Sequence, residues 1–346
     1  NIENFKLFVP HSRGGEKEII TTLLFNKLGF LSPRSALINI EVNGIKRKMI
    51  FQEDIDKNFL EYNNVSESLI FEGFENTGLG LPFSALRISN VNFIKDIRMS
   101  RLAIEKHSFL TQVYLNTGYL DPRVNDALNE KIFFIDPIIN PIFFDDKSRK
   151  EMTLFSILSF ATISTHGLSK DDSRLVYDNF SQTFRPIYYD GNTKIGEYNF
   201  VDTWGSLLDT TVVPFEFLKS HKDELLSRIK NINIKKFNSD LKKLGVSLTQ
   251  KEVEKIFNSV ITNLVNINPI KNLHEKVYAE DIYSFSMENW DSINKQYQNL
   301  KNTKNSEFII SKKNLKASKC ISENKFKDFK KIKFKDDGLK VIKSLL

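Results

Sequence analysis

The sequence predicts an α+β fold in which a mixed N-terminal part precedes a mainly helical remainder. Three observations support this class. Apolar residues recur at helical intervals in several long segments, shorter segments have the alternation of strands, and turn residues such as Asn43-Gly44 separate them. Hydrophobic residues make up 40% of the 346 residues, so the chain can bury a sizeable core.

The first ninety residues predict a strand, a helix, a hairpin and a second helix in that order. Gly29 ends a segment with helical spacing of its apolar residues, and Asn43-Gly44 is a strong hairpin signal between two strand-like segments. We expect a strand over residues 5–9, a helix over residues 16–28, strands over residues 37–42 and 48–51 and a helix over residues 54–63.

The rest of the chain predicts mostly helices. The most apolar of them ends shortly before Gly167, and the later ones are amphipathic. The pair Asp145-Asp146 is expected on a loop surface. The expected helices cover residues 97–116, 153–165, 216–229, 235–244 and 249–264, and two short strands cover residues 175–177 and 186–189.

Positive charge is concentrated at the C-terminal end. Residues 301–346 contain 14 lysines and five acidic residues, so the preceding residues carry about −2 of the net charge of +7. A Lys-rich stretch is most often a solvated surface. Nucleic-acid binding through residues 301–346 is the less favoured alternative, because the stretch contains no Arg, which is the usual reader of bases.

Composition also excludes several classes of protein. No apolar run approaches the roughly 18 residues that a membrane-spanning helix needs. The single cysteine, Cys320, excludes an internal disulfide framework and a Cys-rich zinc site. Both a reducing compartment and a bacterial cell envelope fit this composition.

One loop combines several side chains of the kind that phosphoryl transfer requires. His-Gly-Leu-Ser-Lys-Asp-Asp-Ser-Arg-Leu-Val-Tyr-Asp, residues 166–178, follows the most apolar helix, and a predicted hairpin then places Asp190 before Gly191 at the end of an apolar strand. This chemistry needs a group that orients the acceptor and oxygen ligands that hold Mg²⁺. Each of these residues alone is also typical of a surface turn, and only their conjunction favours a site. The candidates are His166, Asp171, Asp172, Arg174 and Asp190.

The order of helix, His-containing loop, hairpin and strand-end Asp is similar to the catalytic and metal-binding segments of protein kinases. It more closely resembles the CotH (spore coat protein H) family of atypical protein kinases. The resemblance extends to Leu28-Gly-Phe-Leu-Ser-Pro-Arg34, Val42-Asn-Gly44 and Met49-Ile-Phe-Gln-Glu-Asp-Ile-Asp56, and it covers roughly residues 5–210.

The resemblance implies a two-lobed, protein-kinase-like fold. Its small mixed N-lobe would cover about residues 1–90 and its mainly helical C-lobe about residues 91–300, with residues 301–346 as a Lys-rich extension. It also implies that the chain binds ATP and Mg²⁺ and transfers phosphate to a Ser or Thr hydroxyl of a protein substrate.

The resemblance assigns roles to the loop and the hairpin. Asp190 looks like the metal-binding Asp that follows the hairpin, and Asp172 lies near the position of the second metal ligand. Asp171 or His166 would orient the acceptor hydroxyl. Arg174 would hold phosphate or brace the loop.

It assigns further roles to the N-terminal part. Glu18 is similar to the Glu that pairs with a phosphate-binding Lys, and Lys6 is the available partner. Arg13, with Gly14-Gly15, is an alternative phosphate contact. The strand that runs into the hinge would offer backbone groups to adenine from Gln52, Glu53 and Asp54.

The sequence departs from the kinase pattern in two places. The loop reads Asp171-Asp172-Ser173-Arg174, where kinases usually have Asn, and no Gly-rich phosphate loop of the usual form precedes Lys6. These departures favour a second class of function, a catalytically inactive kinase-like protein with an assembly or surface role.

Overall fold

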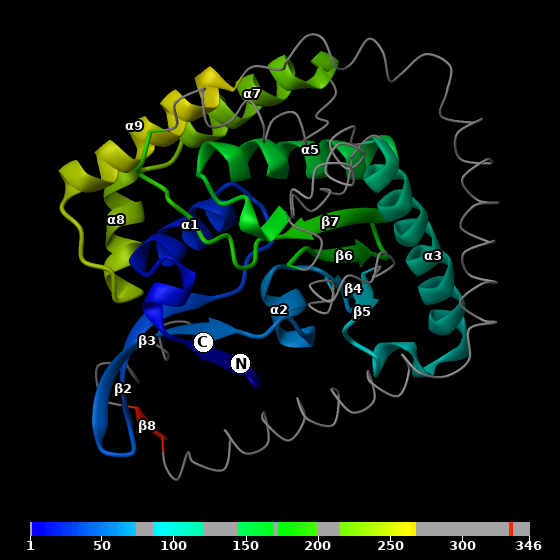
Figure 1. Cartoon of the computed structure of the whole chain (residues 1–346), viewed down its shortest axis with the longest axis horizontal. Coiled ribbons are helices and arrows are strands. Elements are labelled where there is room, and N and C mark those ends of the chain that lie inside the picture. Colours follow the sequence, from blue (N-terminus) through cyan, green and yellow to red (C-terminus); the bar gives the residue numbers. More distant parts are fainter. Residues whose placement is uncertain are drawn as a thin grey trace, which may run out of the picture.

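The computed structural model describes residues 2–73, 86–120, 144–168, 172–198, 215–267 and 332–334. Of residues 114–120, 215–218 and 332–334 it describes the backbone alone. Helices and antiparallel strands alternate along the chain, so the mixed α and β class predicted from the sequence is confirmed (Figure 1).

The N-terminal elements follow the predicted order closely. The hairpin turn lies at Asn43 and Gly44, both with positive φ, as the Asn-Gly signal requires. Asp56 caps the second helix by accepting hydrogen bonds from the backbone of Asn58 and Phe59. The elements are β1 (Phe5–Phe8), η1 (Pro10–Arg13), α1 (Glu16–Lys27), β2 (Ser35–Val42), β3 (Ile45–Glu53) and α2 (Lys57–Tyr62).

Two antiparallel sheets organise the described residues. The first has the order β1-β3-β2-β8, where β8 (Ile332–Phe334) comes from the Lys-rich extension. The second has the order β5-β4-β6-β7, with β4 (Leu69–Glu72), β5 (Arg87–Ile88), β6 (Arg174–Asp178) and β7 (Thr183–Ile187). Because β4 pairs with β6, the second sheet joins segments on both sides of the division expected near residue 90.

The remaining described elements are helical. They are η3 (Phe93–Lys95), α3 (Ile97–Leu120), α5 (Asp146–Ala161), η5 (His166–Leu168), α7 (Phe215–Lys230), α8 (Ile234–Lys243) and α9 (Gln250–Asn266). The prediction that Asp145-Asp146 lies on the surface is confirmed, but the prediction of a loop is wrong. Asp145 is the N-cap of α5, where its carboxylate accepts from the backbone of Lys147 and Ser148, and Asp146 is the first residue of the helix.

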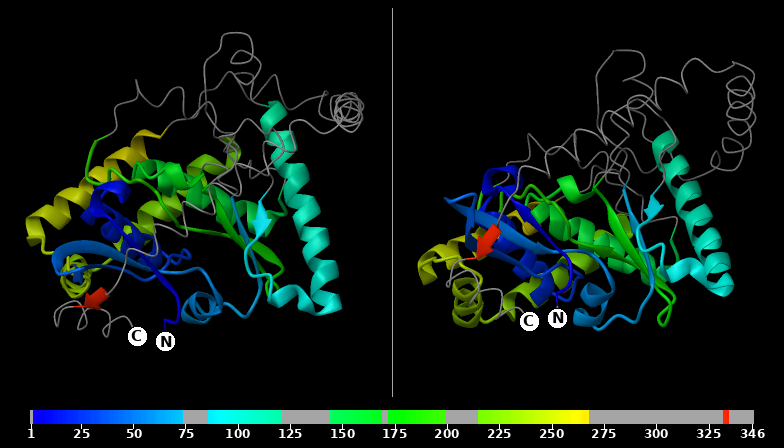
Figure 2. Two further views of the ribbon diagram at one scale, coloured as in Figure 1. Left: turned by 60° about the horizontal axis from the view of Figure 1, so that its bottom comes forward. Right: turned by 90° about the horizontal axis from the view of Figure 1, so that it is seen from below.

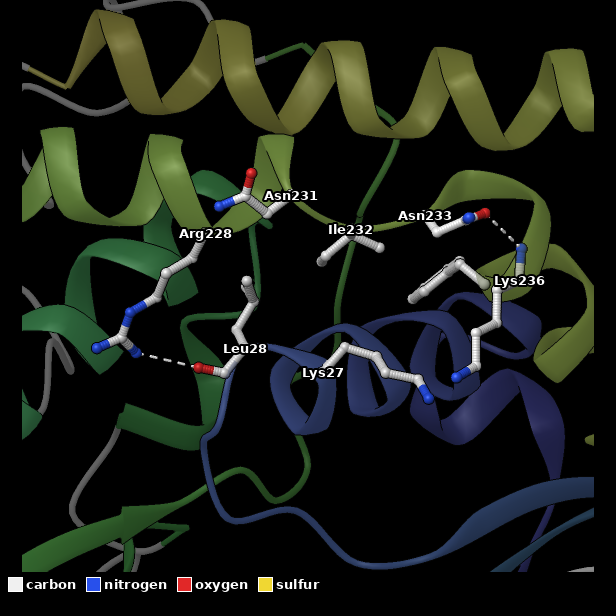
Figure 3. A pocket seen from close by; sticks show the side chains of 8 residues that line it. Lys27, Leu28, Arg228, Asn231, Ile232, Asn233 and Lys236 are labelled. Atoms are coloured by element: carbon white, nitrogen blue, oxygen red, sulfur yellow. Dashed lines mark hydrogen bonds between the residues drawn. The ribbon is translucent and has the colours of Figure 1, made fainter.

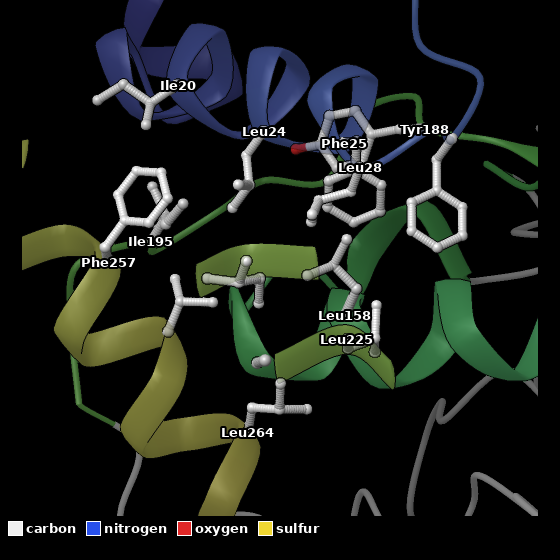
Figure 4. Packing of buried hydrophobic residues seen from close by; sticks show 14 of the residues in the cluster. Ile20, Leu24, Phe25, Leu28, Leu158, Tyr188, Ile195, Leu225, Phe257 and Leu264 are labelled. Atoms are coloured by element: carbon white, nitrogen blue, oxygen red, sulfur yellow. The ribbon is translucent and has the colours of Figure 1, made fainter. Parts of the chain in front are cut away.

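The largest core cluster packs α1 between the first sheet and the C-terminal helices (Figures 1 and 4). Phe25 of α1 is fully buried, with its ring centroid 4.4 Å from that of Tyr188 and 5.3 Å from that of Phe155. Leu225 of α7 and Leu264 of α9 close the cluster from the other side (Figure 4). Helix α1 is therefore held by the residues that follow β7 as well as by α5.

Two rotated views show α3 at the end of the molecule opposite β8 (Figure 2). The described residues that follow β7, 188–198, pass close to α1, where Thr193 contacts Thr21 and Glu197 pairs with Lys17 (Figures 1 and 2). None of the described helices combines the length and the apolar character that crossing a membrane would require.

Candidate functional site

The structure brings together three of the predicted site residues from separate segments. His166 lies in η5 after the end of α5, Asp172 lies just before β6, and Asp190 follows β7. One potential ligand atom from each of the three lies within 4.8 Å of the others. The convergence expected between the His-containing loop and the strand-end carboxylate is therefore present.

His166 is the exposed member of this cluster. Its side chain is 48% exposed, against 12% for Asp172, and its Nδ1 lies 3.1 Å from Asp172 Oδ2. The same Nδ1 lies 3.2 Å from the backbone carbonyl oxygen of Asp190. Both neighbours are acceptors, which favours the tautomer with the proton on Nδ1 and leaves the lone pair on Nε2. Nε2 can therefore act as a base or as a metal ligand.

The turn after β7 is shaped by close packing. Asp190 has φ 47°, in the left-handed region. A Cβ on Gly191 would lie 2.3 Å from the hydroxyl of Tyr188, and a Cβ on Gly167 would lie 2.4 Å from the carbonyl oxygen of Tyr189. Glycine at both positions thus lets the His166 turn and the Asp190 turn approach each other.

Arg13 reaches Asp190 from the turn between β1 and α1. Its guanidinium is largely buried, and Nη1 lies 3.1 Å from Asp190 Oδ2. The same group stacks over the rings of Phe8, at 3.9 Å, and Tyr189, at 4.8 Å. Gly14, with φ 73°, turns the chain immediately after Arg13 and so directs it toward the cluster.

Tyr189 is surrounded by three cationic groups. Besides Arg13, the guanidinium of Arg174 lies 4.6 Å and the ammonium of Lys6 lies 5.7 Å from the centre of its ring. Arg174 is buried, with Nε 3.6 Å from Glu72 Oε2 on the neighbouring strand β4. Each of the three cations also pairs with a carboxylate, Lys6 with Asp54, Arg13 with Asp190 and Arg174 with Glu72. The side of the cluster next to Asp190 therefore gathers cationic groups that could contact phosphates, with their charge balanced in the absence of a ligand.

The ion pair expected between Lys6 and Glu18 is wrong. Lys6 Nζ lies 3.0 Å from Asp54 Oδ1 instead. Burial disfavours the Lys6 ammonium, yet the neighbouring Tyr189 and Asp54 raise its pKa above the ordinary value. Glu18, on α1, accepts a hydrogen bond from the hydroxyl of Tyr188 at 3.0 Å.

Glu18 is fully buried, and its carboxyl is neutral over much of the physiological range. Burial raises the pKa of Glu18 from 4.5 to about 8. The hydrogen bond from Tyr188 and the charge of Arg13 oppose this shift, whereas the charge of Asp190 adds to it. Glu18 thus lies near the cluster as a buried acid, and it does not pair with a lysine.

The backbone donors expected to meet adenine are occupied. The N–H of Glu53 donates to the carbonyl oxygen of Arg34 at 2.9 Å, and the N–H of Asp54 donates to that of Asn4 at 3.0 Å. The side chain of Glu53 is buried in an ion pair with Arg34, and Gln52 is buried beside Ser35. Hinge contacts through the N–H groups of Glu53 and Asp54 are therefore at odds with this structure.

Two of the predictions from the sequence concern residues that are not described. Asp171 lies outside the described residues, and so does all of the segment 301–346 except β8. The sequence analysis in turn missed Tyr188, Tyr189 and Glu72. The position of the two tyrosines in the sequence, directly before Asp190, could have indicated them. A buried Tyr needs a partner for its hydroxyl, and a neighbouring site can supply one.

Comparisons with known proteins leave this arrangement unassigned. No model of a protein family matches the chain, and a search of curated proteins gives no match either. Function therefore has to be inferred from the geometry around His166, Asp172 and Asp190.

Proposed function

We propose that this protein is a kinase-like phosphotransferase of the CotH type. It would bind ATP and Mg²⁺ and transfer the γ-phosphoryl group to a hydroxyl of a protein substrate. The observation that supports this most strongly is the convergence of His166, Asp172 and Asp190 within 4.8 Å. Phosphoryl transfer depends mainly on positioning and charge neutralisation, and the cations around Tyr189 supply charge of the required sign beside that cluster.

The residues present fit a divalent cation. Asp172 and Asp190 are carboxylates with little exposure, and carboxylate oxygens are the protein ligands that Mg²⁺ prefers. His166 Nδ1 lies 3.1 Å from Asp172 Oδ2 and would orient that carboxylate, which leaves Asp172 and Asp190 as the proposed ligands. When bound, the cation would neutralise charge on the nucleotide phosphates.

The protein groups around this position have separable tasks. Lys6, Arg13 and Arg174 would hold the phosphates, with Tyr189 keeping the three cations in place by their stacking over its ring. Nε2 of His166 would accept the proton of the acceptor hydroxyl, since it retains its lone pair and lies on the exposed side.

The order of elements also supports the proposal. A strand with Lys6 leads into a helix with a buried Glu, and a hairpin and a strand-end Asp follow later in the chain. Kinases place a phosphate-binding Lys on a strand and a Glu on the following helix. One core cluster contains residues of the first sheet, α1, α5, α7, α8 and α9, so the two-lobed division that the kinase resemblance implies is at odds with this packing.

A second candidate is a catalytically inactive kinase-like protein with an assembly role. It is favoured by the Arg13–Asp190 ion pair and by the occupied N–H groups of Glu53 and Asp54. Thermal unfolding with ATP, with and without Mg²⁺, separates the two candidates. A phosphotransferase should gain stability with Mg²⁺ and ATP together, whereas an inactive scaffold should gain none.

The decisive activity test replaces Asp190 by Asn. We expect Asp190→Asn to lose transfer of labelled phosphate from ATP, because an amide is a poor substitute for a metal-binding carboxylate. The matched control is Asp223→Asn, which makes the same change on the exposed face of α7 and should keep full activity. Unchanged turnover in a folded Asp190→Asn protein would refute the site.

A further inference from the structure

A pocket that is separate from the His166–Asp172–Asp190 cluster lies at the C-terminal end of α1. It has a volume of about 370 Å³ and opens between the C-terminal end of α1, the C-terminal end of α7 and the start of α8 (Figure 3). None of its lining residues belongs to the cluster of His166, Asp172 and Asp190. The lining residues are Lys27, Leu28, Arg228, Asn231, Ile232, Asn233, Lys236 and Phe237.

Positive charge in and beside this pocket exceeds negative charge. Lys27 Nζ lies 2.8 Å from Asp240 Oδ2, and Lys243 Nζ lies 3.6 Å from Asp240 Oδ1. Burial works against the charge on Asp240, but Lys27, Lys243 and Lys236 together lower its pKa. Of the cationic residues that line the pocket, Lys27 pairs with Asp240 and Arg228 pairs with Glu224, so Lys236 leaves an excess of one positive charge.

Lys27 and Lys236 direct this excess into the pocket. Figure 3 shows their amino groups pointing toward one another across the opening. Within the described part of the chain, no carboxylate lies at ion-pair distance from Lys236. Lys236 also belongs to the first turn of α8, where the helix dipole is positive and the side chain of Asn233 caps the backbone.

The opposite end of the pocket is different in chemistry. Leu28 and Ile232 give it an apolar wall. Arg228 is fixed there, because its guanidinium donates to the carbonyl oxygen of Leu28 at 3.0 Å and pairs with Glu224. This end can accept the uncharged body of a ligand but offers little unbalanced charge.

We propose that this pocket binds a small phosphate monoester. The phosphate group would lie between Lys27 and Lys236, where both ammonium groups can donate hydrogen bonds to its oxygens. The organic group would lie against Leu28 and Ile232, in a volume typical of small-molecule sites. This site is independent of the proposed phosphotransfer, since it uses no residue of that cluster.

The test is calorimetric titration of the full chain with phenyl phosphate and with inorganic phosphate, in EDTA. Phenyl phosphate should bind more tightly than inorganic phosphate, because only the ester fills the apolar end. Lys236→Glu should weaken phenyl phosphate binding roughly tenfold or more, the loss of about one charge-assisted hydrogen bond. Ile232→Ser should weaken binding of the ester and leave inorganic phosphate unchanged.

Two controls make the outcome decisive. Lys251→Glu makes the same change of charge on the exposed face of α9 and should leave binding intact. Equal losses in Lys236→Glu and Lys251→Glu would mean nonspecific charge attraction and would overturn the proposal, as would absence of binding to the wild type. Asp190→Asn should also bind normally, and a loss there would move the ligand to the other cluster.

Discussion

At the scale of single residues, the hydrogen bond between Tyr188 and Glu18 has the widest consequences. Both side chains are fully buried, and Asp190 of the His166–Asp172–Asp190 cluster lies two residues after Tyr188. A second hydrogen bond joins the same two parts of the chain, since the hydroxyl of Thr193 lies 3.0 Å from that of Thr21 in α1. Two side-chain hydrogen bonds therefore join helix α1 to the residues around Asp190. We expect a substitution that displaces α1 to displace the Asp190 turn as well.

Glu18 makes stability depend on pH. Its pKa of about 8 in the folded protein lies above the ordinary 4.5. Between these two pH values the folded chain therefore keeps a proton that the unfolded chain has lost. The free energy of unfolding is unaffected by Glu18 below about pH 4.5, falls as pH rises from there to about 8, and levels off at higher pH. Glu18→Gln removes this loss, so its stability relative to wild type should rise by on the order of 5 kcal/mol between acidic and alkaline pH.

Urea unfolding of both proteins near pH 5, pH 7 and pH 9 measures this difference. A difference in unfolding free energy that is constant over the whole range would show that Glu18 ionises normally.

Tyr188 supplies a second prediction at this scale. Tyr188→Phe removes the hydroxyl that donates to Glu18 and should lower the free energy of unfolding by about 1–3 kcal/mol, because a buried carboxyl loses its partner. Its affinity for Mn²⁺ should also fall, since the Asp190 turn is less firmly placed. Tyr198→Phe is the exposed control and should change neither quantity. Normal Mn²⁺ affinity in Tyr188→Phe would restrict Tyr188 to a structural role.

At the scale of elements, helix α8 is joined to the first sheet at its C-terminal end. The N–H of Leu37 in β2 donates to the carbonyl oxygen of Leu244 at 2.8 Å. Gly245 follows, and a Cβ there would lie 2.1 Å from the carbonyl oxygen of Leu37. The end of α8 and strand β2 are in backbone contact.

A comparison of two glycines with nearly equal φ separates the contribution of this contact from backbone strain. Gly245 has φ 81° and Gly44 has φ 82°, but nothing lies within 4 Å of a Cβ built on Gly44. Gly44→Ala should cost only the backbone strain, about 1–2 kcal/mol. Gly245→Ala should cost several kcal/mol more by the clash with Leu37. Equal losses in thermal or urea unfolding would mean that α8 and β2 are not in contact.

Most elements could be predicted from periodicity and turn residues. The helices over residues 235–244 and 249–264 and the hairpin at Asn43-Gly44 were found within one or two residues. The strands β4, β5 and β8 were missed, because each is four residues or shorter and is formed by pairing with distant strands. The start of α5 was missed because its first turn is polar and is set by the Asp145 cap.

The site was predictable to a different degree. The loop and the hairpin placed His166, Asp172 and Asp190 correctly, because short connections fix where those residues lie. The partners of Lys6 and Glu18 were not predictable. They depend on how α1 packs against the turn after β7, and no local pattern records that contact.

At the scale of the whole molecule, the Lys-rich extension is joined to the first sheet. Strand β8 pairs with β2 at the edge of that sheet, from Ile40–Phe334 to Val42–Ile332. Pairing of this kind covers backbone groups that an open edge would expose. The basic segment 301–346 is therefore tied to the fold through β8, and nucleic-acid binding by it stays a prediction.

Two truncations test this connection. A chain that ends at residue 331 lacks β8 and should lose about 1–2 kcal/mol of stability, as expected for three cross-strand pairs. A chain that ends at residue 337 keeps β8 and should match the full chain. Equal stability of both truncated chains would contradict a structural role of β8.

The central claim is that Asp172 and Asp190, beside His166, hold one divalent cation. Its most direct test is the titration of Mn²⁺ into the wild type, Asp190→Asn and Asp223→Asn, followed by electron paramagnetic resonance. We predict one Mn²⁺ site in the wild type and in Asp223→Asn, and binding weaker by about tenfold or more in Asp190→Asn. Equal Mn²⁺ affinity in all three proteins would contradict the site.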